Sequence, residues 1–162
     1  MLNVAHHQVA DKLANAIYKP LWIMTSHRDG ELSGSLVISA LSLYRSQPVK
    51  VVVCVTKHDY THEVVMASRV FALHVLRPDQ IQLAVHFAYQ SSRNVDKFAS
   101  LDYKIGLTGS PVLKDCLGYM EFEVLADVDT PTHTVVVAEV RNAEAYVPLE
   151  GIVPGAGVND EW

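Results

Sequence analysis

Residues 51–68 read VVVCVTKHDYTHEVVMAS and place a short helical segment directly after a strand-like apolar run. The run at 49–56 is apolar on both faces, which is typical of a strand in the middle of a sheet. It leads to Lys57 in a loop, and Thr61 can cap a helix whose positive end lies near Glu63. Free amide groups at a helix N-terminus, a hydroxyl and a lysine together suit a phosphate group. The alternative is an ordinary capped helix beside a surface lysine.

Upstream of this segment the chain predicts an amphipathic helix and then a β-hairpin. Apolar residues four apart predict the helix over 5–17, and Pro20 ends it. Residues 21–26 form the first expected strand, and Asp29-Gly30 is a strong turn signal for a hairpin.

The second arm of this hairpin, residues 32–43, carries unusually small side chains. In a strand with a two-residue period, Ser33, Ser35 and Ser39 fall on one face together with Val37. A face this small leaves room for a flat ligand. The alternative is that this face is a solvent-exposed edge of the sheet.

Downstream, further short strands alternate with helical segments. We expect strands at 71–76, 117–126 and 133–141, a short helical turn at 94–100, and a helix from Asp79 with an apolar stripe of Ile81, Ala84, Val85 and Ala88. Many short strands with two or three helices predict a mainly β fold, an antiparallel barrel with added helices. Residues 1–147 form a single domain in this interpretation, and 148–162 an extended C-terminal tail.

Composition and charge argue against several classes of function. The chain has 162 residues, of which 49% are apolar, enough for one substantial core. A net charge of −5 with scattered basic residues argues against nucleic acid as a partner. The longest purely aliphatic and cysteine run is far shorter than the roughly 20 residues that span a bilayer, and the first residues do not read as a secretory signal. We therefore expect a cytoplasmic protein with no membrane partner.

The cysteines and histidines do not indicate a metal centre. Cys54 and Cys116 lack metal-ligand spacing and are interpreted as core residues. His58 and His62 are four apart, but the predicted helix begins after His58 and too few further ligands lie nearby. His133 opens a strand after a proline-containing loop, where it is either a surface residue or a functional one. No nucleophile motif, Walker-type loop or dinucleotide fingerprint occurs.

Several short blocks follow one another in an informative order. They are VISAL at 37–41, VCVTK at 53–57 with YTHE at 60–63, FALHVL at 71–76, the helical segment 80–87, DKF at 96–98, GSPVL at 109–113 and HT at 133–134. In this order they resemble the flavin reductase family, whose fold is an FMN-binding split barrel. That family includes flavoredoxins and the reductase components of two-component monooxygenases. The resemblance covers residues 18–145 and implies an antiparallel split barrel here.

The resemblance also implies a cofactor and roles for named residues. The cofactor would be FMN, with FAD possible, and its ring would lie along the strand at 37–41. Lys57 and Thr61 would hold the phosphate. The full set implied to contact the cofactor is Val37, Ile38, Ser39, Ala40, Thr56, Lys57, Thr61, His62, Lys97 and Phe98. His133 would receive the nicotinamide of NADH or NADPH, and no side chain would be catalytic because the protein only aligns the two rings.

The chain departs from the family pattern at four places. Val37 replaces a threonine, His74 an asparagine and Thr132 an aspartate, and residues 148–162 replace a tyrosine-rich closing strand. The function implied is an NAD(P)H-dependent flavin reductase, a homodimer that delivers reduced flavin to an oxygenase or electron-transfer partner. Two alternatives stay open, a flavoredoxin-like electron carrier without nicotinamide activity and a non-enzymatic split-barrel binding module.

Overall fold

The computed structural model describes residues 21–38, 41–44 and 47–148. The predicted helix at 5–17, Ser39, Ala40 and the tail from residue 149 onward lie outside the described residues. In chain order the elements are β1 (Trp22–Arg28), β2 (Glu31–Val37), β3 (Leu41–Tyr44), β4 (Lys50–Thr56), α2 (Tyr60–Ser68), β5 (Val70–Val75), α3 (Ile81–Tyr89), β6 (Tyr103–Ile105), β7 (Pro111–Leu113), β8 (Gly118–Asp129) and β9 (His133–Ala145).

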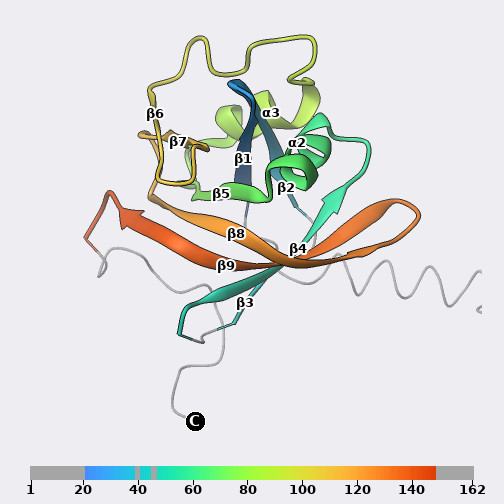
Figure 1. The fold of residues 1–162 in the computed structure, drawn as a ribbon. Coiled ribbons are helices and arrows are strands. Elements are labelled where there is room, and N and C mark those ends of the chain that lie inside the picture. The colour runs from blue at the N-terminus through green and yellow to red at the C-terminus, as the bar shows by residue number, and fades with distance from the viewer. Residues whose placement is uncertain (1–20, 39–40, 45–46, 149–162) are drawn as a thin grey trace, which may run out of the picture.

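Seven of these strands form one antiparallel sheet in the order β2-β1-β5-β8-β9-β4-β3. Strands β6 and β7 pair separately. The sheet curls, and both helices lie on the same side of the long β8–β9 ribbon (Figure 1). The predicted mainly β, antiparallel barrel-like fold with added helices is therefore confirmed. Of the described helices, none has the length and apolar character needed to cross a membrane.

The main core lies on the inner face of the curled sheet. Phe71 of β5 stacks on Phe122 of β8 with ring centroids 5.2 Å apart, and Val65 of α2 packs against the same cluster. Neighbouring strands bring Val53 of β4 opposite Val136 of β9, and both are fully buried. Alternation of apolar residues along each strand thus places one continuous apolar layer under helix α2.

The sequence predicts that residues 32–43 form one continuous arm of the hairpin, and this prediction is wrong. The segment divides into β2 and β3, which lie at opposite edges of the sheet. The Asp29-Gly30 hairpin itself is confirmed, with φ of 52° and 85° at its two central residues. Ser33 and Ser35 are buried because α2 packs over this face, so the face is neither fully open to a ligand nor an exposed edge.

Strand β4 is correctly located and lies inside the sheet as predicted, because it pairs with β9 on one side and with β3 on the other. Val51, Val53 and Val55 face the core, whereas Val52 is 36% exposed. Cys54 is only half-buried, so its interpretation as a core residue is wrong, while Cys116 is buried as predicted. Both faces of β4 are apolar, but only one of them packs in the core, and the other belongs to the outer face of the sheet.

The apolar stripe predicted for helix α3 is also wrong in part. Ala84 is buried, but Ile81 and Val85 are 54% and 42% exposed. The buried face is set instead by Phe87, whose ring meets that of Phe98 at 5.7 Å. The short helical turn predicted at 94–100 corresponds to a stretch of turns, in which the backbone N–H of Leu101 donates to the oxygen of Phe98 at 3.0 Å.

Candidate functional site

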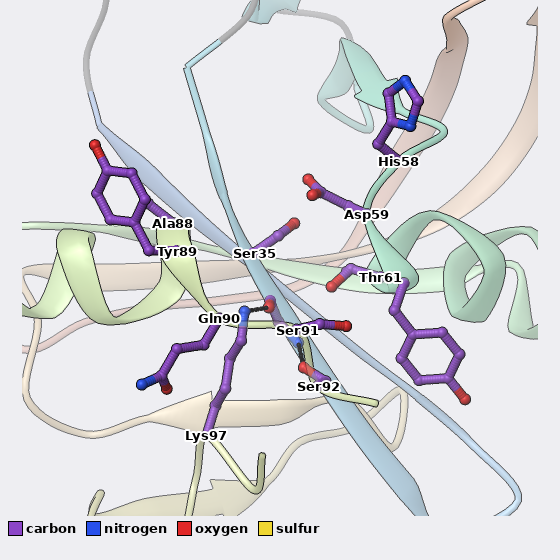
Figure 2. Close-up of a pocket in the computed structure, with 12 residues that line it drawn as sticks. Ser35, His58, Asp59, Thr61, Ala88, Tyr89, Gln90, Ser91, Ser92 and Lys97 are labelled. Atoms are coloured by element: carbon purple, nitrogen blue, oxygen red, sulfur yellow. Dashed lines mark hydrogen bonds between the residues drawn. The ribbon is translucent and has the colours of Figure 1, made fainter. Parts of the chain in front are cut away.

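A polar pocket of about 210 Å³ opens between β2, the N-terminus of α2 and the segment that follows α3 (Figure 2). Its lining residues come from four separate parts of the chain: Gly34, Ser35, His58–Thr61, Ala88–Ser92 and Lys97. The side chains of Ser35, Asp59 and Thr61 turn toward the same space, while those of His58 and Tyr89 point away.

Lys97 is a buried cation at the base of this pocket. Its Nζ donates to the backbone oxygen of Gly34 at 2.7 Å and to that of Phe87 at 3.0 Å (Figure 2 shows the first). Burial lowers the pKa of Lys97 to about 8, although nearby Asp59 acts in the opposite direction. An ammonium has three N–H donors. Among the described residues two of them are used, so the third can serve a ligand in the pocket.

The N-terminus of α2 forms the facing wall. The N-cap is Asp59, whose side chain makes no capping hydrogen bond, so the prediction that Thr61 caps the helix is wrong. Thr61 lies in the first turn, and its hydroxyl bonds that of Ser33 at 2.8 Å. Burial raises the pKa of Asp59, while the charge of Lys97 partly offsets this. The free backbone N–H groups in the first turn of α2 form the positive end of the helix dipole, and this end lies beside the pocket.

The third wall is the stretch after α3, which is tied to the edge strand. The backbone N–H of Gly34 donates to the Ser92 hydroxyl at 3.2 Å. Phe98 is 2% exposed and packs between the rings of Phe87 and Tyr103, so it anchors the adjacent Lys97 rather than lining the pocket. Phe98 and Lys97 were both implied to lie near the cofactor, and the structure brings only Lys97 to the pocket.

Lys57 belongs to a second group of residues at the tip of the β8–β9 hairpin. Its Nζ pairs with Asp129 at 2.5 Å, and its backbone N–H donates to the oxygen of Thr132 at 3.0 Å. Lys57 is not among the residues that line the pocket, whereas Thr61 is. Of the two residues implied to hold one phosphate, the buried Thr61 therefore lines the pocket and Lys57 contacts the β8–β9 hairpin instead.

The remaining predicted residues of β4, α2 and β9 surround this second group. Thr56 pairs with His133 across the β4–β9 ladder. His62 Nε2 hydrogen-bonds the Thr134 hydroxyl at 2.7 Å, and burial lowers the pKa of His62, with Lys57 adding to that shift. His133 is half-buried, and its Nδ1 bonds the Thr132 hydroxyl at 2.9 Å.

Of two further predicted residues, Val37 ends β2 and Ile38 follows it. Val37 is 5% exposed and packs in the main core, and Ile38 is 55% exposed. Among the described residues no cluster of three or more His, Cys, Asp or Glu side chains could hold a metal ion, so His58 and His62 form no such site.

Sequence reasoning missed two polar residues that line the pocket, Asp59 and Ser92, whereas Ser35 belongs to the small-residue face that the sequence singled out. Asp59 carried a usable signal, because an aspartate directly before a helix is a preferred N-cap. Ser92 carried none, because its place depends on a contact with Gly34, 58 residues away in the chain.

Comparisons with known proteins identify relatives with this fold. The family model described as "Flavin reductase like domain" matches residues 14–149. A ferric-chelate reductase (NAD(P)H) of Archaeoglobus fulgidus is 32% identical over 132 residues, 80% of this chain and 78% of that protein. The reductase component of a 4-nitrophenol monooxygenase of Rhodococcus opacus is 33% identical over 123 residues, 76% of this chain and 64% of that protein.

Among solved structures, an NADH:FAD oxidoreductase of Streptomyces globisporus superimposes with a TM-score of 0.78. The match covers 90% of this chain and 87% of that one at 22% sequence identity. At that identity the likeness supports the fold.

Proposed function

The chain belongs to the flavin reductase-like family, and from this premise we propose that it is an NAD(P)H-dependent flavin reductase that binds FMN in the Lys97 pocket. Flavin binding and oxidoreductase activity follow from the family and its named relatives. NAD(P)H as the electron donor is supported by the name of the Archaeoglobus fulgidus relative. The single observation that carries the proposal is the buried ammonium of Lys97 facing the N-terminus of α2.

The pocket residues fit the phosphate end of FMN. Lys97 supplies a charged N–H donor, the first turn of α2 supplies backbone N–H donors, and the hydroxyls of Ser35 and Ser92 add neutral ones. Asp59 is the one group that would oppose a phosphate. Its raised pKa makes the carboxyl easier to protonate, which lowers that repulsion.

Bound flavin would supply the two-electron chemistry, and the chain's own residues bind and orient the two partners. His133 lies at the end of β9 beside Thr56, clear of the Lys97 pocket. We assign it to the nicotinamide side. The proposed acceptor is a partner oxygenase that consumes reduced flavin, which is supported by the relative named as a monooxygenase reductase component.

A second candidate is a flavoredoxin-like electron carrier that keeps its FMN and lacks nicotinamide activity. The observation that favours it is the hydrogen bond between His133 Nδ1 and the Thr132 hydroxyl, where the family pattern has an aspartate. The Thr132 hydroxyl is neutral, so it orients the His133 imidazole without the negative charge that an aspartate carboxylate would place beside it.

We also propose that the protein is a homodimer. Directly paired residues on the outer face of β4, β9 and β8 form two apolar rows, Val52–Val137–Ala126 and Cys54–Val135–Val128. Val128 is 62% exposed, and no described helix lies on this side of the ribbon (Figure 1). A second copy would cover this face, and we expect an interface above about 2,000 Å² in total, typical of obligate pairs.

An anaerobic titration tests the reductase proposal. We expect the purified protein to retain or take up FMN, and NADH or NADPH to bleach the flavin absorbance without oxygen. His133→Ala should leave FMN affinity nearly unchanged and lower kcat/KM for the nicotinamide by about 5- to 150-fold, as expected for one lost polar contact of about 1–3 kcal/mol.

His27→Ala is the matched control, because His27 does not line the pocket and its Nε2 hydrogen-bonds the backbone oxygen of Thr108 in the loop between β6 and β7. It should change neither quantity. A flavin that dithionite reduces but neither nucleotide reduces would contradict the proposal and favour the electron carrier.

A further inference from the structure

The tip of the β8–β9 hairpin carries His133 and projects beyond the rest of the sheet (Figure 1). Strand β5 pairs with β8 only as far as Glu123, so among the described residues no strand supports the remainder of β8 on that side. On the other side, the β4–β9 ladder ends at the pair of Thr56 with His133. Where His133 lies therefore depends on further contacts at the tip.

The turn that joins the two strands is tied to His133 by Thr130. The Thr130 hydroxyl donates to the backbone oxygen of His133 at 2.6 Å and accepts from its backbone N–H at 3.2 Å. The backbone N–H of Thr130 donates to the same oxygen at 2.9 Å. Because these bonds join the turn to His133, contacts made by neighbouring residues of the tip also place His133.

The residues on both sides of His133 are tied to the segment that begins α2. On one side, the backbone N–H of Lys57 donates to the oxygen of Thr132 at 3.0 Å. On the other side, the ring Nε2 of His62 hydrogen-bonds the Thr134 hydroxyl at 2.7 Å. The start of α2, which also forms a wall of the Lys97 pocket, thus supports the strand end that carries His133.

The contact of His62 with Thr134 is shielded from water, because Thr134 is only 2% exposed. The Thr134 hydroxyl also donates to Asp129 at 3.4 Å, so its oxygen accepts from His62 and Nε2 carries the proton of the neutral ring. The side chains of the Lys57 and Asp129 ion pair are 31% and 73% exposed, and such a pair contributes little free energy. The shielded contact of His62 is therefore the one whose loss should displace the tip.

His133 does not line the Lys97 pocket, but its charge acts on a residue that does. Burial raises the pKa of Asp59, the charge of Lys97 is the largest effect that opposes this, and the charge of His133 is a smaller one. Charges interact appreciably only over short distances, so the imidazole lies near this wall of the pocket. Displacing the hairpin tip would therefore displace His133 relative to a flavin bound in the pocket.

We propose that His62 is a positioning residue for flavin reduction, which holds the hairpin tip through Thr134 so that His133 can receive the nicotinamide. The inference rests on the proposed function, which assigns His133 to the nicotinamide side. His62 does not line the Lys97 pocket, so in this role it acts on the nicotinamide and not on FMN binding. This role differs from the cofactor contact that the family resemblance implies for His62.

Anaerobic reduction of FMN-loaded protein by NADH or NADPH tests this role. His62→Leu removes the hydrogen bond and should lower kcat/KM for the nucleotide by about 3- to 30-fold, because a displaced His133 loses part of its contact. FMN affinity should change by less than about 2-fold. His62→Gln should restore most of the lost rate, because the glutamine amide can still donate to Thr134.

His27→Leu is the matched control for His62→Leu. His27 is also a half-buried histidine whose Nε2 makes one hydrogen bond, at 3.1 Å to the backbone oxygen of Thr108 in the loop between β6 and β7. The control should change neither kcat/KM nor FMN affinity. Thermal unfolding of each variant checks that the fold is retained.

A double-mutant cycle separates the positioning of His133 from a general effect on the protein. In a His133→Ala background, His62→Leu should cause little further loss of kcat/KM, because the residue that His62 positions is then absent. A full additional loss would mean that His62 acts independently of His133, and would overturn the proposal. A loss of FMN affinity as large as the loss of kcat/KM would also overturn it, because His62 would then support the flavin site.

Hydrogen exchange gives a readout that does not depend on activity. Amides at 130–134 should exchange faster in His62→Leu than in the wild type, and His62→Gln should restore the wild-type rates. Unchanged exchange at the tip in His62→Leu, or faster exchange with unchanged kcat/KM, would contradict the proposal. Failure of the proposed function looks different, because neither nucleotide would then reduce the flavin of the wild-type protein, while exchange at the tip would still show whether His62 holds it.

Discussion

At the scale of single residues, His74 shows how a departure from the family pattern is accommodated. Its Nδ1 donates to the backbone oxygen of Ile23 at 3.0 Å, and its Nε2 accepts from the backbone N–H of Leu113 at 3.1 Å. The ring is completely buried. An asparagine, which the family pattern has here, also offers one donor group and one acceptor group. The histidine is therefore a structural link between β1, β5 and β7.

The buried ring of His74 makes folding sensitive to acid. Burial lowers its pKa to about 4, from 6.5, despite opposing effects of Ile23 and Glu121. Between these two values the unfolded chain binds a proton that the folded chain does not, so stability is lost as pH falls from about 6.5 to about 4. At about 1.4 kcal/mol per pKa unit, the loss is about 3 kcal/mol. Urea unfolding at several pH values measures it.

His74→Asn is the informative variant for this prediction. It should fold and should lose this part of the pH dependence, because asparagine does not titrate. An acid dependence identical to that of the wild type between pH 6.5 and 4 would show that other groups are responsible.

Two lysines provide the residue-scale test of the phosphate site. Lys97→Met should weaken FMN by about 10- to 150-fold and riboflavin much less, because riboflavin lacks the phosphate. Lys57→Met removes only the exposed pair with Asp129 and should have a small effect on both. Isothermal titration calorimetry measures the four affinities. A larger FMN loss in Lys57→Met than in Lys97→Met would assign the phosphate to the hairpin group instead.

At the scale of elements, Glu121 of β8 holds the loop between β6 and β7. This fully buried carboxylate accepts from the backbone N–H groups of Leu107 at 3.0 Å and Thr108 at 2.8 Å, and from the Asn142 amide at 2.8 Å. Burial raises the pKa of Glu121, but these hydrogen bonds outweigh it and hold the pKa below its usual value. Gly106 packs so closely on the carboxylate that a Cβ would collide with it.

Glu121→Gln should therefore release this loop. The glutamine NH₂ group would face N–H donors, leaving a buried bond unmade at a cost of about 1–3 kcal/mol. Hydrogen exchange should show faster exchange at 106–109 than in the wild type, with the β8–β9 ladder unchanged. Glu123→Gln, on the same strand but exposed in its pair with Arg141, should have no such effect. Unchanged exchange in Glu121→Gln would contradict this role.

At the scale of the whole molecule, the outer face of the β4–β9–β8 ribbon is the basis for the proposed homodimer. Val137→Lys would place a charge in the middle of the row formed with Val52 and Ala126. Burying an unpaired ammonium is costly, so we expect the variant to be monomeric or to associate at least about 10-fold more weakly. Light scattering at micromolar concentration measures this.

The control for the dimer prediction is Val85→Lys on α3, a valine that is 42% exposed on the other side of the ribbon. It should leave the association unchanged. A wild-type protein that is monomeric under these conditions would show that the face is not an interface between copies.

Local sequence patterns determined much of the fold. The Asp29-Gly30 turn, the strands β4, β5, β8 and β9 and the start of a helix after His58 all follow from period, turn chemistry and helix signals that act over a few residues. The order of the blocks along the chain determined the family. These features need no knowledge of distant contacts, because neighbouring residues alone set backbone preference and the alternation of side chains.

Tertiary structure alone decided which residues meet. Lys57 lies in the loop next to Thr61 and looked like its partner from spacing, yet Lys97 reaches the pocket. Lys97 does so because its ammonium bonds Gly34, 63 residues away, and because Phe98 is anchored in the core. Strand order likewise decided whether an apolar face of a strand packs against the core. Such outcomes depend on long-range pairing and on competition between side chains for the same buried space, which no short window of sequence contains.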